Sequence, residues 1–419
     1  MSMIFTRSFV GIYFFGFRVG ELLVLSSLLI CVVSILSFRL KFFEKYKILF
    51  NKYFVLIFIS FFLVVVLTNT NLLNTYTYKS SSYVWTIGFL FFGVFLHQFL
   101  DNLDKKILIL PIFLPLIIYI FNTGNYPNFL IDFFKENSDK FQYTKASDIF
   151  LSVVIIYFYL EKLKFNSTTK VTYLFFYTSL ILPVMIILSR GSYVGILIFA
   201  ALGLYFERKY LFQNRLRILI YSICAILLFI LSTFRASGVE IGARSVNTEV
   251  ITEQVKANNQ IKDTRKAFLT FYIEDGRLFS KDETTNWRLD IWQDVFSDMK
   301  NENILFLGYG YKSIIPQMLD PAAPGRLGRD GLNEHVHNYF VTILSRGGLI
   351  QLLLFILFHL SLIRIWFEKN NNYKLFIYYI PVIFVSILDI SMDGVQFPLL
   401  FYSGLGYFLS DMNSKSILD

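Results

Sequence analysis

The chain has 419 residues, of which 55% are hydrophobic, 19% aromatic and only 16% charged, and its mean hydropathy is +0.55. This composition excludes a water-soluble globular protein, which would need more polar surface to cover its core. Segment 234–336 carries 13 Lys and Arg against 15 Asp and Glu, whereas the rest carries 26 against 15. Because the basic excess lies in short loops between apolar runs, it indicates membrane orientation, and we expect no nucleic-acid partner.

Apolar runs of roughly 15–20 residues recur along the chain, and about 20 helical residues cross a bilayer core. Backbone groups in lipid must be satisfied within the segment, so these runs are expected to be helices. The sequence predicts an all-α, polytopic integral membrane protein with about 11–12 transmembrane helices and one large, partly helical outer loop. The eleven clearer spans are 20–37, 53–67, 83–100, 106–121, 147–160, 171–188, 192–206, 216–233, 349–367, 374–388 and 395–410; a twelfth is possible at 3–17.

Basic loops orient these spans. Segments 38–52, 161–170 and 207–217 are rich in Lys and Arg and are predicted to be cytoplasmic. The opposite side then receives segments 68–82, 122–146, 189–191, 234–336 and 389–394. Three parts follow: an N-terminal transmembrane bundle (1–233), a large periplasmic or extracellular loop with amphipathic helices (234–348), and C-terminal transmembrane helices (349–419).

Two further patterns limit which metal, disulfide or cofactor sites are expected. Cys31 and Cys224 each lie in an apolar run, and no Cys/His spacing suggests a metal site, so we expect neither a disulfide framework nor bound metal. Gly308-Tyr309-Gly310 allows a tight turn or a close approach of backbone to a ligand. It is neither a dinucleotide nor a Walker motif, and we expect no cofactor.

Arg288 stands out within a predicted amphipathic helix. At 100° per residue, the apolar side chains of this helix share one broad face: Trp287, Ile291, Trp292, Val295, Phe296 and Met299. Arg288 projects close to the middle of that face, where an unpaired guanidinium would be very costly. The spacing leaves two interpretations open: a structural ion pair, with Glu334 for example, or contact with an anionic ligand.

Arg190 lies in Ser189-Arg190-Gly191-Ser192, a tight turn between two apolar runs at the outer interface. The N-terminus of the following helix attracts anions, and an arginine beside it makes a good phosphate site. The alternative is an arginine that reaches toward lipid headgroups, as is common at span ends.

His337 is one of four histidines and is predicted to open a helix in which Phe340, Val341 and Leu344 share its face. An imidazole at this position can act as a base near neutral pH. The plainer interpretation is a buried packing residue. His335, two residues earlier, is either its neighbour or an ordinary loop residue.

In this order, these pieces resemble a known family, the bacterial O-antigen polymerases and O-antigen ligases. The resemblance rests on Ser189-Arg190-Gly191, a large outer loop late in the chain, the stretch from Trp287 to Trp292, Gly308-Tyr309-Gly310 and His337-Asn338-Tyr339-Phe340. Gly347-Gly348-Leu349-Ile350 and Arg18-Val19-Gly20-Glu21 also look like the family's pattern. The architecture covers nearly the whole chain, but the motifs occupy only 189–195 and 286–353.

The resemblance implies a metal-independent, inverting transfer of a glycan from undecaprenyl diphosphate to an acceptor hydroxyl. It places the chain in the bacterial inner membrane with the active site facing the periplasm. By the family's pattern, Arg190 and Arg288 would bind the pyrophosphate and His337 would take the acceptor proton. His335, Asn338, Gly308 and Gly310 are supporting candidates. Implied partners are lipid-linked oligosaccharides, membrane lipids and a chain-length regulator.

The acceptor distinguishes the candidate functions. A polymerase extends a carrier-linked repeat unit, whereas a ligase transfers the polymer to lipid A-core. We favour the polymerase because such proteins are rich in Phe and Tyr and diverge widely. A lipid-linked oligosaccharide flippase is the alternative of another class, but transporters usually carry charged residues within their spans, and such residues are scarce here.

Overall fold

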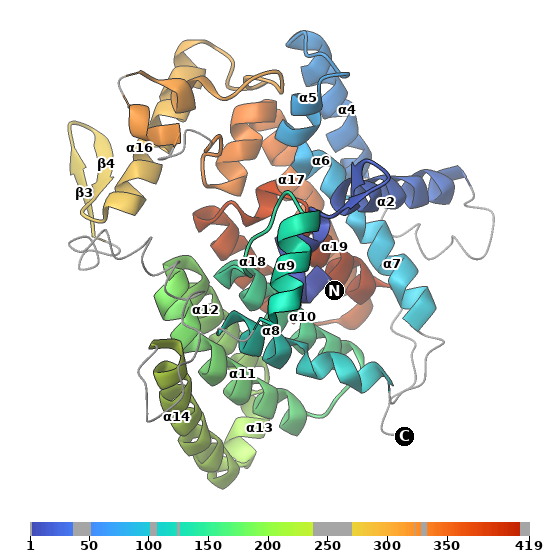
Figure 1. Cartoon of the computed structure of the whole chain (residues 1–419), viewed down its shortest axis with the longest axis vertical. Helices are drawn as coiled ribbons and strands as arrows, with labels where there is room; N and C mark the ends of the chain where they lie inside the picture. Colours follow the sequence, from blue (N-terminus) through green and yellow to red (C-terminus); the bar gives the residue numbers. More distant parts are fainter. Residues whose placement is uncertain are drawn as a thin grey trace.

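The computed structural model describes residues 2–36, 52–100, 107–123, 126–237, 270–321, 323–327 and 333–410. These residues are mainly helical and contain almost no strand, which confirms the predicted all-α class (Figure 1). Each of the eleven clearer spans coincides with a helix or with two consecutive helices. They are α2 (Val19–Leu36), α4 (Lys52–Leu67), α6 (Ser82–Thr86) with α7 (Phe89–Leu100), η2 (Ile107–Phe113) with α8 (Leu114–Asn122), α10 (Ala146–Lys162), α11 (Ser167–Leu188), α12 (Arg190–Phe206), α14 (Arg215–Ser237), α17 (Tyr339–Asn370), α18 (Phe376–Leu388) and α19 (Gln396–Leu409).

Helix length and composition support a membrane protein. In the described part of the chain, five helical segments of 18 residues or more are apolar enough to cross a membrane, and four apolar helices are shorter, at 10–17 residues. Shorter elements connect them: α5 (Thr75–Ser80), α9 (Asn128–Asn137), α13 (Arg208–Gln213), η4 (Pro316–Leu319), η5 (Pro324–Leu327) and η6 (Ser391–Asp393).

The possible twelfth span is not formed. Helix α1 (Ser2–Val10) has only nine residues, a rise of about 14 Å, which is less than half of a bilayer core. A short hairpin follows it, in which the two-residue strands β1 (Tyr13–Phe14) and β2 (Phe17–Arg18) pair, and this hairpin leads into α2. Segment 3–17 therefore packs at the edge of the bundle and does not cross it.

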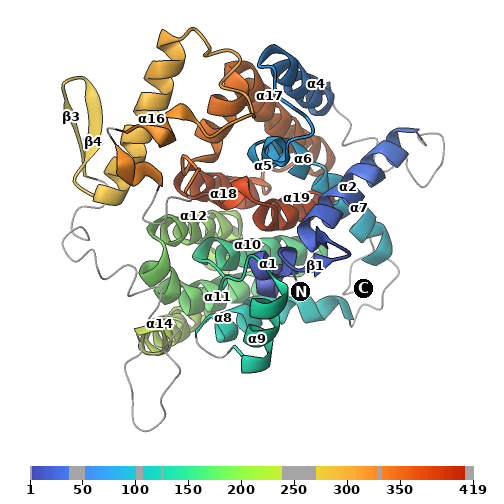
Figure 2. The same ribbon diagram turned by 45° about the horizontal axis from the view of Figure 1, so that its top comes forward.

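Glycines bring α7 and α19 into close contact. A Cβ atom on Gly93 would lie 2.0 Å from the carbonyl oxygen of Ser403, and one on Gly406 would lie 2.0 Å from that of Leu90. Small residues at such crossings let helix backbones approach each other, which is how helices associate where lipid offers no hydrophobic driving force. This pair anchors the core around α10, which Figure 2 shows among α8, α11, α12, α18 and α19.

Helices α10, α11, α12 and α18 bring charged residues together at one end of the bundle. Lys170 Nζ lies 2.8 Å from carboxylate oxygens of both Glu161 and Glu207, and Lys374 Nζ lies 2.6 Å from Glu161. We name these four residues the paired cluster. All of them come from segments or span ends predicted to be cytoplasmic.

The outer segment has a small core of its own. The apolar face of α16 (Glu283–Asn301) buries Ile291, Val295 and Met299 against residues that include Val336. Phe296 was predicted on this face, but it is 51% exposed, because the buried stripe is narrower than the projection suggested. A hairpin of β3 (Phe271–Glu274) and β4 (Arg277–Ser280) lies beside α16 (Figure 1).

Helix α17 begins at Tyr339 and kinks at Gly348, whose φ of +70° is a left-handed conformation that favours glycine. A Cβ there would lie 2.2 Å from the carbonyl oxygen of Phe306. The outer segment therefore packs directly on the kink. The helix also runs through residue 348, where the outer loop was predicted to end.

Candidate functional site

Arg190 is the first residue of α12, at the opposite end of that helix from the paired cluster. The Ser189 side chain caps the helix by accepting a hydrogen bond from the amide of Ser192. A Cβ on Gly191 would lie 3.2 Å from the Leu388 side chain, so the glycine allows the start of α12 to pack against the end of α18. The sequence around Arg190 thus fixes the guanidinium at a capped helix N-terminus, next to Asp389.

Arg190 forms an ion pair with an acidic residue of the outer segment. Its Nη1 donates to Oδ1 of Asp282 at 2.6 Å. Asp282 is the N-cap of α16 and also accepts a hydrogen bond from the Thr285 amide. Burial alone would raise the pKa of Asp282, but hydrogen bonds from Thr285 and Arg190 hold it below its ordinary value. The ion pair therefore ties α12 to the beginning of the helix that carries Arg288.

Arg288 is the less satisfied of the two arginines. Its Nε is buried and finds no hydrogen-bond partner among the described residues. Burial is the main cause that lowers its pKa; Asp389 and Asp282 oppose this shift, and Arg190 adds to it. Glu334 is not its partner, because that carboxylate pairs with Lys79 at 2.7 Å. A half-buried cation with an unsatisfied nitrogen is suited to bind an anion.

His337 lies next to Arg288 but does not open a helix as predicted. It precedes α17 and has a left-handed φ of +54°. Such a conformation is uncommon for a residue other than glycine and is often found at functional sites. The imidazole packs edge-on against Trp287, with ring centroids 5.1 Å apart, and its Nε2 lies 3.1 Å from Oδ1 of Asn333. Burial and the nearby Arg288 lower the pKa of His337 to about 3.

The supporting candidates have separate roles. Asn338 is the N-cap of α17, and its Oδ1 accepts hydrogen bonds from the amides of Phe340 and Val341. The cap fixes the point where the helix begins and therefore the position of His337 just before it. His335 points away from this site, with its Nδ1 3.3 Å from Asp393.

Gly308 and Gly310 belong to the packing of the outer segment on α17. Both have positive φ, and a Cβ on Gly308 would lie 2.7 Å from backbone atoms of Arg346. The amides of Tyr309 and Gly310 donate to the carbonyls of Ser345 and Arg346, just before the kink. The motif therefore satisfies backbone groups that the kink releases from the helix.

Asp389 is the residue that the sequence reasoning missed. It is the C-cap of α18, and its charge opposes the burial-driven pKa shifts of both Arg288 and His337. The sequence contained one indication that Asp389 lies near the site, because it is the first residue of a short loop that was predicted to be on the outer side. Its proximity to residues a hundred positions earlier could not be read from the sequence.

Other arginines near the loop have structural partners. Arg277 lies 2.9 Å from Asp290 and 2.7 Å from Asp294 on α16, and Arg235 donates to Thr123. Arg244 and Arg265 lie outside the described residues.

A family model described as O-Antigen ligase matches residues 174–356, a segment that contains Arg190, Arg288 and His337. No curated protein matches the chain. Over these residues, the match bears out the resemblance to the O-antigen polymerases and O-antigen ligases seen in the motifs.

Proposed function

We propose that the chain is an O-antigen polymerase, or the polymerase of a related surface polysaccharide, in the bacterial inner membrane. It would transfer a glycan from undecaprenyl diphosphate to a hydroxyl of a carrier-linked repeat unit on the periplasmic side. One observation carries the proposal: a half-buried Arg288, whose buried Nε has no bonded partner among the described residues, lies beside Arg190, His337 and the N-terminus of α12.

The donor diphosphate would lie between the two arginines. Arg288 offers its guanidinium, and the capped start of α12 adds its unpaired amides. Arg190 would turn part of its hydrogen bonding from Asp282 to the phosphate. Both cations would then stabilise the negative charge that develops on the leaving diphosphate. Glycosyl transfer breaks the sugar–phosphate bond as the acceptor oxygen attacks the anomeric carbon.

His337 would accept the proton of the acceptor hydroxyl. With a pKa of about 3, the imidazole is neutral at physiological pH but is a weak base. A diphosphate bound beside it would bring negative charge, which favours the protonated form and raises the pKa. Donor binding would therefore prepare the base, and proton transfer would be poor until the donor is in place.

The ligase is the second candidate, because the matching family model is described as O-Antigen ligase. Both activities use the same donor chemistry and differ only in the acceptor. The polymerase is favoured by the aromatic-rich composition and the sparse match to shared motifs.

Deletion of the gene followed by gel analysis of surface lipopolysaccharide separates these candidates. A polymerase deletion should leave core carrying a single repeat unit. An uncapped core, with long chains retained on the lipid carrier, would identify the ligase instead. Complete ladders in the deletion strain would contradict both. Restoring the gene with Arg190→Ala, Arg288→Ala or His337→Ala should give no chain extension although the protein accumulates in membranes.

A further inference from the structure

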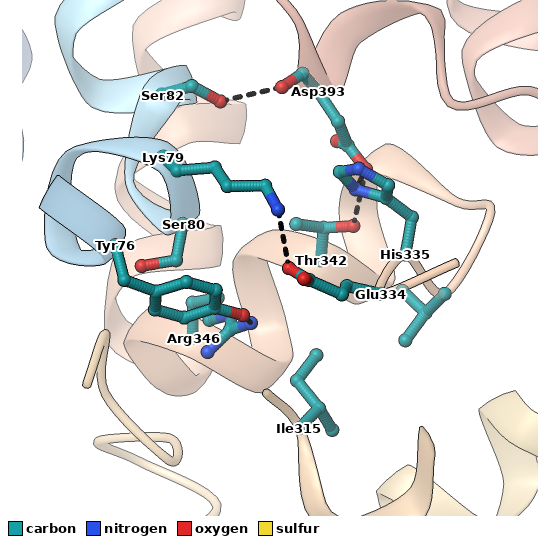
Figure 3. A pocket seen from close by; sticks show the side chains of 11 residues that line it. Tyr76, Lys79, Ser80, Ser82, Ile315, Glu334, His335, Thr342, Arg346 and Asp393 are labelled. Carbon is teal, nitrogen blue, oxygen red and sulfur yellow. Dashed lines mark hydrogen bonds and ion pairs between the residues drawn. The ribbon is translucent and has the colours of Figure 1, made fainter. Parts of the chain in front are cut away.

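A second polar pocket lies on the other side of the segment that carries His337. It is formed by α5 and the start of α6, by the loop before α17, by α17 itself and by η6 (Figure 3). The enclosed part is small, about 20 Å³, and the pocket opens to solvent. Its lining is rich in side chains that donate or accept hydrogen bonds. Those used below are Lys79, Glu334, His335, Thr342, Arg346 and Asp393.

Asp393 is the least satisfied group in the pocket. Its side chain is only 4% exposed. One oxygen, Oδ2, accepts a hydrogen bond from Thr342 and lies 3.3 Å from Nδ1 of His335 (Figure 3). The other oxygen, Oδ1, is buried and has no hydrogen-bond partner among the described residues. A buried carboxylate oxygen in this state is costly, and a hydroxyl donor from a ligand would relieve that cost.

Lys79 and Glu334 form an ion pair across the pocket, from α5 to the loop before α17 (Figure 3). The Lys79 side chain is 55% exposed, so the pair is solvated. Ion pairs of this kind contribute little to stability, and their side chains separate readily. Once they part, an ammonium group with three donors and a carboxylate with several acceptor positions line the pocket.

The charges of the pocket favour a neutral ligand rich in hydroxyl groups. Lys79 is balanced by Glu334, and Arg346 is occupied by the carbonyl oxygens of Gly310 and Ser313. The unsatisfied oxygen of Asp393 would repel a phosphate. Nor does any group of three His, Cys, Asp or Glu side chains in the described part of the chain gather as metal ligands do. Sugar hydroxyls both donate to carboxylates and accept from ammonium groups, so a sugar matches the whole lining.

We propose that this pocket binds a sugar residue of the acceptor glycan. The inference rests on the proposed function, because it needs an acceptor that carries sugars. The segment from Asn333 to Asn338 separates the pocket from the diphosphate site, with His335 facing the pocket and His337 facing Arg288. An acceptor sugar held by Asp393 would thus lie close to the base that takes its proton. Lys79, Glu334 and Asp393 are positioning residues in this account.

Steady-state kinetics with two distinguishable substrates test the inference. The full chain is reconstituted in lipid vesicles with the repeat unit on undecaprenyl diphosphate as donor. The same repeat unit with an alkyl chain in place of the diphosphate carrier can only accept. Lys79→Ala and Asp393→Asn should each raise the KM for this acceptor by about fivefold or more. The KM for the donor should stay within twofold of the wild-type value.

If Asp393→Asn fails to fold, Lys79→Ala still tests the pocket, because an exposed ion pair contributes little to stability. The matched control is Lys135→Ala, an exposed lysine on α9 outside the pocket, which should change neither constant. An unchanged acceptor KM in both pocket variants would overturn the inference, and so would equal rises in the donor and acceptor KM. If the wild type transfers only to lipid A-core, the polymerase proposal fails. The same variants then test the pocket, with lipid A-core as the acceptor whose concentration is varied. A wild type that transfers to neither acceptor would overturn both proposals.

Discussion

Two charged clusters lie at opposite ends of α12 and α18, and they differ in how their charges are paired. The paired cluster joins two lysines to two glutamates, each within 2.8 Å of an opposite charge. At the other end, Arg190 and Arg288 face Asp282 and Asp389. Among the described residues, only Arg190 and Asp282 form an ion pair there.

Each cluster therefore holds two positive and two negative side chains. They differ in how many of these charges are left without an ion-pair partner and could bind a ligand. Ion pairing of every charge stabilises helix ends and leaves no unpaired charge for a ligand. Incomplete pairing is costly in the absence of a ligand and is retained where binding compensates for it. The comparison supports the proposed site at the end where the buried Nε of Arg288 has no bonded partner among the described residues.

The largest effect on stability is expected at the paired cluster. Lys170→Met would leave Glu161 and the buried Glu207 with Lys374 as their one remaining cation in the paired cluster. Removal of one partner from a buried pair costs about 3–5 kcal/mol. The melting temperature in detergent should fall sharply, and less protein should accumulate in membranes. Lys209→Met, at an exposed lysine of α13, is the control and should change neither. An unaltered melting temperature in the Lys170 variant would show that the two clusters do not differ as described.

Arg288→Met should have the opposite profile. Loss of one group that stabilises developing charge lowers the rate about a hundred- to a thousandfold. The melting temperature should hold or rise, because a half-buried charge without a bonded partner among the described residues is replaced by an apolar side chain of similar length. Chain extension in cells and thermal unfolding of the purified protein measure the two effects. A large loss of stability would instead identify Arg288 as a structural residue.

Asn338→Ala should lower both stability and activity by smaller amounts, because the N-cap of α17 also holds His337 in position. Loss of the cap costs about 1 kcal/mol and loosens the start of α17, where His337 is positioned. Activity should decrease several-fold, although the melting temperature should show that nearly all of the protein remains folded. Asn338→Asp retains a capping oxygen and should restore much of the activity. Equal losses in both variants would mean that the amide group, and not the cap, is what matters.

The last effect expected is a pH dependence of stability. Because the folded-state pKa of His337 is lowered to about 3, the unfolded chain binds more protons between that value and its own pKa of about 6.5. Stability should therefore fall as the pH decreases from about 6.5 towards 3. His337→Asn should flatten this slope in melting curves recorded at pH 5 and pH 7. The same slope in wild type and variant would contradict the assigned environment of His337.

The sequence located the helices better than the contacts between them. Apolar runs predicted eleven spans, because the bilayer imposes both length and composition. The β3–β4 hairpin was missed, although Asp275-Gly276 between two short β-prone stretches is a typical hairpin turn. Arg190, Arg288 and His337 could be selected from their positions, but their partners could not. Asp282 lies 92 residues from Arg190, and Asp389 joins the site only because α18 ends beside the start of α12.

The most direct test is binding of undecaprenyl diphosphate, without its glycan, to the purified full chain in nanodiscs. The account predicts saturable binding to the wild type that is at least tenfold weaker in Arg288→Met and in Arg190→Met. Arg277→Met, which removes an arginine already paired with two aspartates of α16, should bind as the wild type does. Equal affinity in the wild type and the Arg288 variant would contradict the claim that the incompletely paired cluster is the diphosphate site.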